Sequence, residues 1–134
     1  MSAFALVPPD AASVARMQAA MQEIWSSSLH VIRGRVDAID AAARASPSAE
    51  DFAARREEGA REAHKLAGIA GSFGFHEASR LAALVEHRLA TADGDGTGDA
   101  PDLGELAARI RWHLDLDAPY APERGPEAYR GQHQ

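Results

Sequence analysis

The sequence contains no cysteine among its 134 residues. Without cysteine the chain can form neither a disulfide framework nor a thiolate metal site, and this composition suits a reducing compartment. It also lacks any apolar run near the roughly twenty residues that a membrane-spanning helix needs. The first ten residues have neither the charged start nor the long apolar run of a signal peptide. We therefore expect a cytoplasmic protein with no membrane partner.

Basic residues are in the minority: 14 Lys and Arg stand against 20 Asp and Glu, which gives a formal net charge of −6. Proteins that bind nucleic acid or anionic membranes in a general way need a basic face to meet the phosphates. The charge balance therefore argues against nucleic acid as a partner. Recognition of any anionic group must come from a local set of residues.

The alternation of apolar and polar residues that is typical of half-buried strands is almost absent. Apolar residues instead recur at steps of three and four, which indicates amphipathic helices. Four helices are predicted, over residues 10–45, 49–72, 76–91 and 102–116. Because their connections are mostly short, we expect an all-α fold, an antiparallel four-helix bundle in up-down-up-down order.

The first predicted helix is long, about 50 Å, and we expect a bend near residues 26–28 or Gly34. Ser48 with Asp51 three residues later resembles a capping box before the second helix, and Asp102 is the expected N-cap of the fourth. The core stripe predicted for the first helix consists of Val14, Met17, Met21, Ile24, Trp25, Leu29, Ile32, Val36, Ile39 and Ala43.

These helices divide the chain into an N-terminal extension (1–9), the bundle (10–116) and a Pro- and Gly-rich tail (117–134). We expect the tail to be mobile or loosely docked. The stretch "ADGDGTGDAPD", residues 92–102, resembles the start of a calcium-binding loop, but its twelfth position is Gly104, where a bidentate glutamate is needed. We interpret it as an acidic connection and expect no metal site.

His64 is the candidate functional residue of the second helix. On a wheel with about 100° per residue it lies roughly 160° from the buried Leu66, so we expect it to point away from the core. Apart from Arg61, the residues that share its face have the smallest side chains: Ala60, Ala67, Gly68 and Gly71.

The two glycines each cost about 1 kcal/mol relative to alanine inside a helix, so their presence needs a reason. One interpretation is that small neighbours leave the imidazole exposed, so that a second protein can bring a reactive group up to it. An imidazole is partly neutral near pH 7 and can act as a nucleophile. The other interpretation is close helix packing, which on this wheel would require a second protomer.

The stretch "AHKLAGIAGSFGF", residues 63–75, resembles the phosphoacceptor motif of histidine-containing phosphotransfer (HPt) domains of bacterial two-component signalling. The surrounding helix order is also similar, over roughly residues 20–116. The resemblance implies a four-helix bundle whose histidine exchanges a phosphoryl group with the aspartate of a receiver domain. The matching residues are His64, Leu66, Gly68, Gly71, Phe73 and Gly74.

By this resemblance His64 is the phosphoacceptor, Gly68 gives the receiver access to the ring, and Phe73 with Gly74 closes the helix. Ala60, Ala67 and Gly71 would complete the docking surface. The implied partners are the receiver domain of a response regulator and a sensor or hybrid histidine kinase. We expect no cofactor in this chain, magnesium in the partner receiver, and a monomeric phosphoryl carrier without catalytic activity of its own.

One position departs from the family pattern. Many members carry a lysine three residues after the histidine, where this chain has Ala67. We hypothesise, from position alone, that Arg61 or Lys65 contacts the phosphoryl oxygens instead. The missing lysine also keeps open an alternative function, a docking adaptor or kinase inhibitor that has lost phosphotransfer. A third alternative is a helical dimerisation domain without a signalling role.

Overall fold

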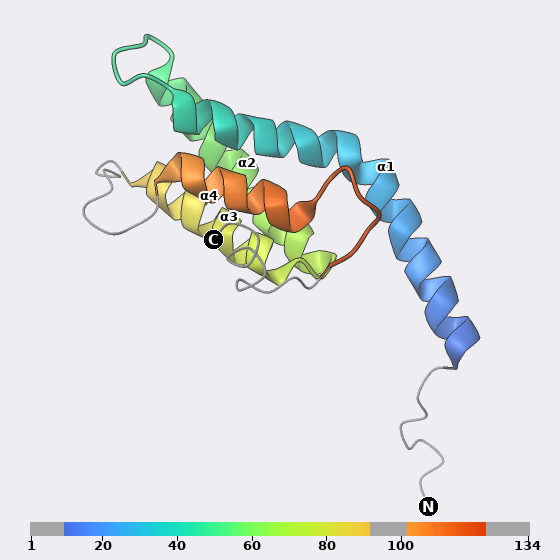
Figure 1. Cartoon of the computed structure of the whole chain (residues 1–134). Helices are drawn as coiled ribbons and strands as arrows, with labels where there is room; N and C mark the ends of the chain where they lie inside the picture. Colours follow the sequence, from blue (N-terminus) through green and yellow to red (C-terminus); the bar gives the residue numbers. More distant parts are fainter. Residues whose placement is uncertain (1–9, 92–101, 123–134) are drawn as a thin grey trace, which may run out of the picture.

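The computed structural model describes residues 10–91 and 102–122. Within these ranges all regular secondary structure is helical, as predicted, with helices α1 (Ala11–Arg44), α2 (Phe52–Ser72), α3 (His76–Ala90) and α4 (Leu103–Leu114). The main contacts join α1 with α2, α2 with α3, α3 with α4, and α4 with α1. The four helices therefore form a closed bundle (Figure 1), and their bounds lie within three residues of those predicted from periodicity.

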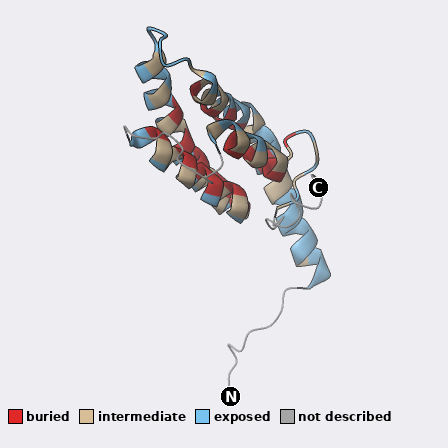
Figure 2. Ribbon diagram, turned by 60° about the vertical axis from the view of Figure 1, so that its left-hand side comes forward, coloured by how far each residue is buried: buried red, intermediate tan, exposed pale blue. Residues whose placement is uncertain are grey.

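Apolar residues from all four helices fill the bundle, and Figure 2 shows the buried positions turned toward one another. The largest fully buried side chains are Trp25, Ile32, Ile39, Leu66, Leu81, Leu106, Ile110, Leu114, Val36 and Val85. Burial of a side chain of this size stabilises the fold by roughly 1.5–3 kcal/mol. In α2 the buried stripe is Gly59, Ala63, Leu66 and Ala70, as the helical wheel predicted, except that Phe52 is only partly buried.

Helix α1 extends beyond the bundle. Asp10 is the N-cap of α1, and its carboxylate accepts a hydrogen bond from the Ser13 N–H at 2.7 Å. This first part of the helix is exposed (Figure 2). The hydroxyls of Ser27 and Ser28 both donate to the carbonyl of Ile24, at 2.9 Å each. Such back-bonding bends helices, and Figure 1 shows α1 changing direction between its dark-blue and cyan parts.

The predicted core stripe of α1 is wrong at its N-terminal end. Val14, Met17 and Ile24 are exposed, at 37%, 62% and 51% of their surface, whereas Trp25 is buried. The periodicity identified an apolar helix face correctly. It could not indicate that the other helices are too short to cover this face along its whole length.

The connection between α2 and α3 is a tight turn that depends on Gly74. Its φ of +88° is a conformation that residues with a side chain rarely adopt. The Gly74 N–H donates to the Gly71 carbonyl at 3.1 Å and the Phe75 N–H to the Ala70 carbonyl at 2.8 Å. This pair of bonds is a Schellman motif, which ends α2 and turns the chain into α3.

The capping box predicted before α2 is not formed. Asp51 is the N-cap residue, but its side chain makes no cap hydrogen bond and instead accepts from Arg55 at 2.5 Å. At α4 the prediction is confirmed, because the Asp102 carboxylate accepts from the Glu105 N–H at 2.7 Å. The calcium-loop resemblance falls mostly on residues 92–101, which lie outside the described residues.

The first residues after α4 pack against the bundle. Tyr120 joins an aromatic cluster with Trp25, Phe73 and Phe75, with ring centroids 5.7–6.0 Å from its own. Its hydroxyl donates to the Phe73 carbonyl, and its N–H donates to the Gln22 side chain at 2.7 Å. The docked part of the chain therefore continues past the expected boundary at residue 116. Residues 1–9 and 123–134 lie outside the described residues.

Among the described residues, none of the helices combines the length and the apolar character that crossing a bilayer requires.

Candidate functional site

His64 lies on the outer face of α2, where it borders α3. Its side chain is 74% exposed, while Leu66 two residues later is fully buried. The helical wheel placed both correctly, because Ala63, Leu66 and Ala70 hold one side of α2 against the core. The imidazole is therefore accessible to a second protein.

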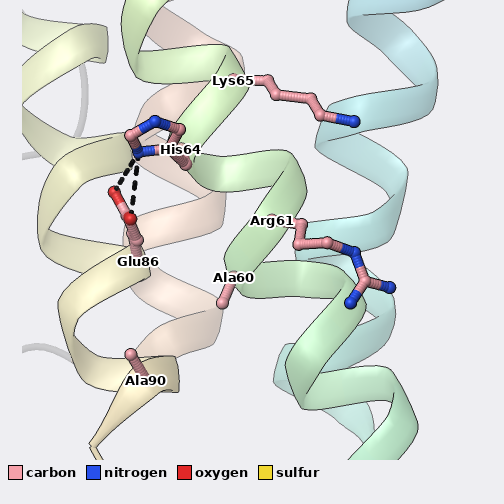
Figure 3. A pocket seen from close by; sticks show the side chains of 6 residues that line it. All are labelled: Ala60, Arg61, His64, Lys65, Glu86 and Ala90. Atoms are coloured by element: carbon pink, nitrogen blue, oxygen red, sulfur yellow. Dashed lines mark hydrogen bonds and ion pairs between the residues drawn. The ribbon is translucent and has the colours of Figure 1, made fainter.

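Glu86 of α3 is the direct partner of the imidazole. Its two carboxylate oxygens lie 3.2 Å and 3.0 Å from Nδ1 of His64 (Figure 3). An ionised carboxylate can only accept hydrogen bonds, so Nδ1 must carry the proton in this contact. The neutral ring then has its lone pair on Nε2, the nitrogen that does not contact Glu86.

Sequence reasoning missed Glu86. It lies 22 residues after His64, on another helix, and no sequence spacing links the two positions. Only the register between α2 and α3 brings them together. Buried Val85 and Leu89 fix this register by turning the Glu86 side of α3 toward the edge of the α2–α3 interface.

Gly68 lies one turn after His64 in open space. A Cβ built at Gly68 would meet no heavy atom within 4 Å. The packing of residues 10–91 and 102–122 therefore gives no reason for a glycine here. The prediction that Gly68 leaves room for an approaching partner is compatible with this open surface.

Gly71 has a different environment. A Cβ at this position would lie 3.3 Å from the Ser79 hydroxyl of α3. The same hydroxyl donates to the carbonyl of Ala67 at 2.7 Å. The small size of Gly71 therefore allows α2 and α3 to approach closely within one chain. The expectation that close packing at Gly71 would need a second protomer is wrong, since the wheel could not show where α3 lies.

A shallow hollow of about 340 Å³ lies beside the imidazole. It is lined by Ala60, Arg61, His64, Lys65, Glu86 and Ala90. Two of the lining residues, Ala60 and Ala90, have small side chains, so a group that approaches His64 from this side meets little steric resistance. The hollow thus joins Ala60 of α2, which the sequence indicated, to Glu86 and Ala90 of α3, which it did not.

The two cations proposed to contact a phosphoryl group are near His64 but extend toward α1 (Figure 3). Arg61 pairs with Glu58 at 2.5 Å and Lys65 with Glu62 at 3.4 Å. Both cationic side chains are more than half exposed, so these pairs contribute little to stability and can exchange. Either cation must leave its acidic neighbour to reach an anion on the imidazole.

Glu62 is held more firmly than Glu58. It also accepts from Arg35 of α1 at 2.9 Å, and only 16% of its side chain is exposed. Lys65 therefore sits next to a fixed carboxylate, whereas the partner of Arg61 is exposed. This difference favours Arg61 as the more mobile of the two cations.

In the part of the chain that the structure describes, no group of three or more His, Cys, Asp or Glu side chains could hold a metal ion. The site consists of one imidazole, one carboxylate that orients it, open space at Gly68 and two nearby cations. Such a set can supply an oriented nitrogen nucleophile to a group brought by a partner.

Comparison with known protein families supports the helical fold and places the chain in a family. The model of the Hpt domain matches residues 23–118, which include most of α1 and all of α2, α3 and α4. Searches of the curated proteins and of the solved structures gave no significant match. The match covers well over half of the chain and includes the motif around His64. The chain therefore belongs to the Hpt family, whose domains carry phosphoryl groups in phosphorelays.

Proposed function

We propose that His64 accepts a phosphoryl group from the aspartyl phosphate of a receiver domain and passes one to or from a response regulator. The observation that carries this proposal is the contact between Nδ1 of His64 and Glu86 on an otherwise exposed imidazole. This contact keeps the proton on Nδ1 and directs the Nε2 lone pair outward. Gly68 and the hollow beside Ala60 leave room for the incoming group.

In the transfer step the lone pair of Nε2 forms a bond to phosphorus while the bond between phosphorus and the aspartyl oxygen breaks. The aspartate leaves as a carboxylate, and no proton has to move. The ring then carries one positive charge with its proton on Nδ1, and the Glu86 carboxylate stabilises this charge through the same hydrogen bond. The reverse step regenerates the neutral ring.

Phosphoryl transfer depends mainly on positioning and on neutralising negative charge. Glu86 supplies positioning, because it fixes the rotation and the tautomer of the imidazole. Magnesium held by the partner receiver would supply most of the charge neutralisation. Arg61, and to a lesser extent Lys65, would add a cation from this chain, in place of the lysine that many family members carry at the position of Ala67.

The chain would act as a carrier between two partners, a receiver domain and a sensor or hybrid histidine kinase, in the cytoplasm of a bacterium. A carrier must release each partner after transfer. The small residues around His64 offer a shallow contact, which suits weak and short-lived binding. Ala60, Ala67 and Gly68 lie one helical turn from His64 on α2 and would form the centre of this contact.

The direct test is incubation of the purified chain with a receiver that carries a labelled aspartyl phosphate. We expect label on the chain that is lost in acid, as a phosphoramidate requires, and that is absent from the His64→Gln variant. His87→Gln is the matched control, because His87 is an exposed histidine next to Glu86 on α3, and it should be labelled like the wild type. Receiver binding without any labelling would refute the proposal and favour a docking adaptor.

A further inference from the structure

The face of α1 that meets α2 continues past the ends of the other helices. Met21 on this face packs against the edge of the core and borders a hollow beside Tyr120, whereas Val14, Met17 and Ile24 are exposed. Near the C-terminal end of α1 two residues on this face meet α2. Arg35 donates a hydrogen bond to Glu62, and Ala42 packs so closely against Gly59 that a Cβ on Gly59 would lie 2.6 Å from its own. Positions seven residues apart on the same face are Val31, Ile24 and Met17. Their exposure rises toward the N-terminus, at 47%, 51% and 62%.

We define the α1 strip as the residues Val14, Met17, Met21 and Ile24. They follow one another at steps of three, four and three, which is the spacing of a seam between two helices. The other positions on this face of α1 are also uncharged: Ala20, Ser27 and Ser28. The occupant that this pattern fits is therefore another helix with an apolar face, just as α2 is in the bundle.

We propose that the α1 strip pairs with the α1 strip of a second copy of this chain in an antiparallel, two-fold symmetric contact. The absence of charge favours a second copy, because contacts that select a different partner use complementary charges, whereas homodimer interfaces are more apolar. It also allows chains of net charge −6 to meet without repulsion in the contact itself. This proposal replaces the expectation of a monomer.

The antiparallel arrangement follows from the shape of the molecule. The first part of α1 stands clear of the bundle (Figure 1), so two copies that overlap there in opposite directions place their bundles at opposite ends. In the register that aligns the strips, Val14 of one copy lies opposite Ile24 of the other, and Met17 lies opposite Met21. The same register brings Arg16 to the level of Glu23 of the second copy on one flank.

The contact is small and does not involve the phosphotransfer site. Val14 and Ile24 are about 15 Å apart along the helix, so the buried area is below that of a standard protein interface, and we expect a weak dimer that forms as concentration rises. The family match begins at residue 23, so Val14, Met17 and Met21 lie outside it. His64 lies on the side of α2 that faces α3 and not α1 (Figure 3), and both copies would keep it accessible.

Sedimentation velocity of the full chain from about 1 μM to about 500 μM tests the proposal. We expect a rising dimer fraction in the wild type, and an association constant at least about tenfold lower in the double variant Met17→Glu, Ile24→Glu, since four carboxylates would meet in an apolar seam. The matched control is Ala12→Glu, Ala19→Glu, which places the same charges seven residues apart on the opposite, exposed flank of α1 and should dimerise like the wild type.

Cross-linking tests the arrangement independently of any change in folding. Because the chain has no cysteine, oxidation of a mixture of Val14→Cys and Ile24→Cys chains should give mainly the mixed disulfide dimer. A wild type that stays monomeric at the highest concentration, or a dimer that survives Met17→Glu, Ile24→Glu, would overturn the proposal. Predominant Ile24→Cys homodimers would overturn the antiparallel arrangement. Phosphotransfer to His64 should be the same in both double variants, so this test is separate from that of the proposed function.

Discussion

The carboxylate of Glu86 on α3 lies 3.0 Å from Nδ1 of His64 on α2. A carboxylate in this position selects the tautomer of the imidazole and fixes the orientation of the ring. Neighbouring carboxylates have the same effect on many reactive histidines. Only 36% of the Glu86 side chain is exposed, so the contact is partly shielded from water. Nε2, the nitrogen that we propose to react, is thus oriented before a partner arrives.

Replacement of Glu86 by alanine should slow phosphoryl transfer to His64 by about 10- to 100-fold, which is the usual effect of removing a group that orients a functional histidine. The ring of this variant would rotate freely and populate both tautomers. Glu86→Gln should have a smaller effect, since its amide oxygen can still accept from Nδ1 although the charge is lost. Single-turnover transfer from a phosphorylated receiver measures both rates.

Glu105→Ala is the control for the Glu86 variants. Glu105 is an acidic residue on α4 that pairs with Arg109 at 3.0 Å and has no contact with His64. Its removal changes the net charge by the same amount and should leave the transfer rate unchanged. Equal rates for wild type and Glu86→Ala would remove the orienting role of Glu86, provided that circular dichroism shows a folded variant.

Alanine substitution of Arg61 should shorten the lifetime of the phosphohistidine or slow its formation by a few-fold, as expected for the loss of one exposed charge-assisted contact. Lys65→Ala should have a smaller effect, because Lys65 is next to Glu62, which Arg35 holds in place. Arg55→Ala is the matched control, since Arg55 pairs with Asp51 at the start of α2, well before His64. If Arg61→Ala and Lys65→Ala both behave like the wild type, neither residue contacts the phosphoryl group.

Substitution of Gly68 by a residue with a side chain should leave the bundle folded, whereas a bulky side chain there should block phosphoryl transfer to His64. Gly68→Ala should raise the free energy of unfolding by about 0.5–1 kcal/mol, since it improves helix propensity and meets no atom within 4 Å. Gly68→Arg should leave the melting temperature nearly unchanged and abolish transfer by blocking the approach to His64. Thermal denaturation and the labelling assay, applied to the same samples, separate the two effects.

Gly34→Arg is the control for a bulky residue at an open helical glycine, because a Cβ at Gly34 also meets nothing within 4 Å. This variant should fold and transfer normally. By contrast, Gly59→Ala should destabilise the bundle by about 1–3 kcal/mol, since its Cβ would lie 2.6 Å from that of Ala42. A Gly68→Arg variant that unfolds, or that transfers at the wild-type rate, would contradict the docking role of Gly68.

The fold was predictable from sequence because each helix carries its own evidence. Residues such as Leu66 and Ala70 recur at helical spacing, and the wheel that buries them also turns His64 outward. Local signals of this kind need no knowledge of the other helices. For the same reason the four helix bounds and the N-cap at Asp102 were close to those observed.

The features that sequence could not predict depend on how the helices are placed relative to one another. Glu86 reaches His64, and Ser79 reaches Gly71, only because α2 and α3 pack in one register. Met17 has the same periodicity as the buried residues of α1 but is exposed, because no other helix among the described residues covers that part of α1. Periodicity indicates which face is apolar, whereas the lengths and positions of the neighbouring helices decide whether it is buried.

Tyr120 should be part of the cooperative folding unit although it follows the last helix. Tyr120→Phe removes the hydrogen bond to the Phe73 carbonyl and should lower the free energy of unfolding by about 1 kcal/mol. Tyr120→Ala also removes the ring from the cluster with Trp25 and Phe75, and should cost about 3 kcal/mol. Urea denaturation measures both values.

Ala121→Ser is the control for the Tyr120 variants, because Ala121 is the exposed neighbour and its substitution should be neutral. The Phe73 carbonyl lies at the end of α2, in the turn that leads to α3, so Tyr120 also ties the last residues of the bundle to the helix that carries His64. Unchanged unfolding of Tyr120→Ala would show that the Tyr120 side chain adds nothing to the stability of the bundle. A loss of stability without a loss of phosphotransfer at low temperature would place Tyr120 in the support of α2 and not in the reaction at His64.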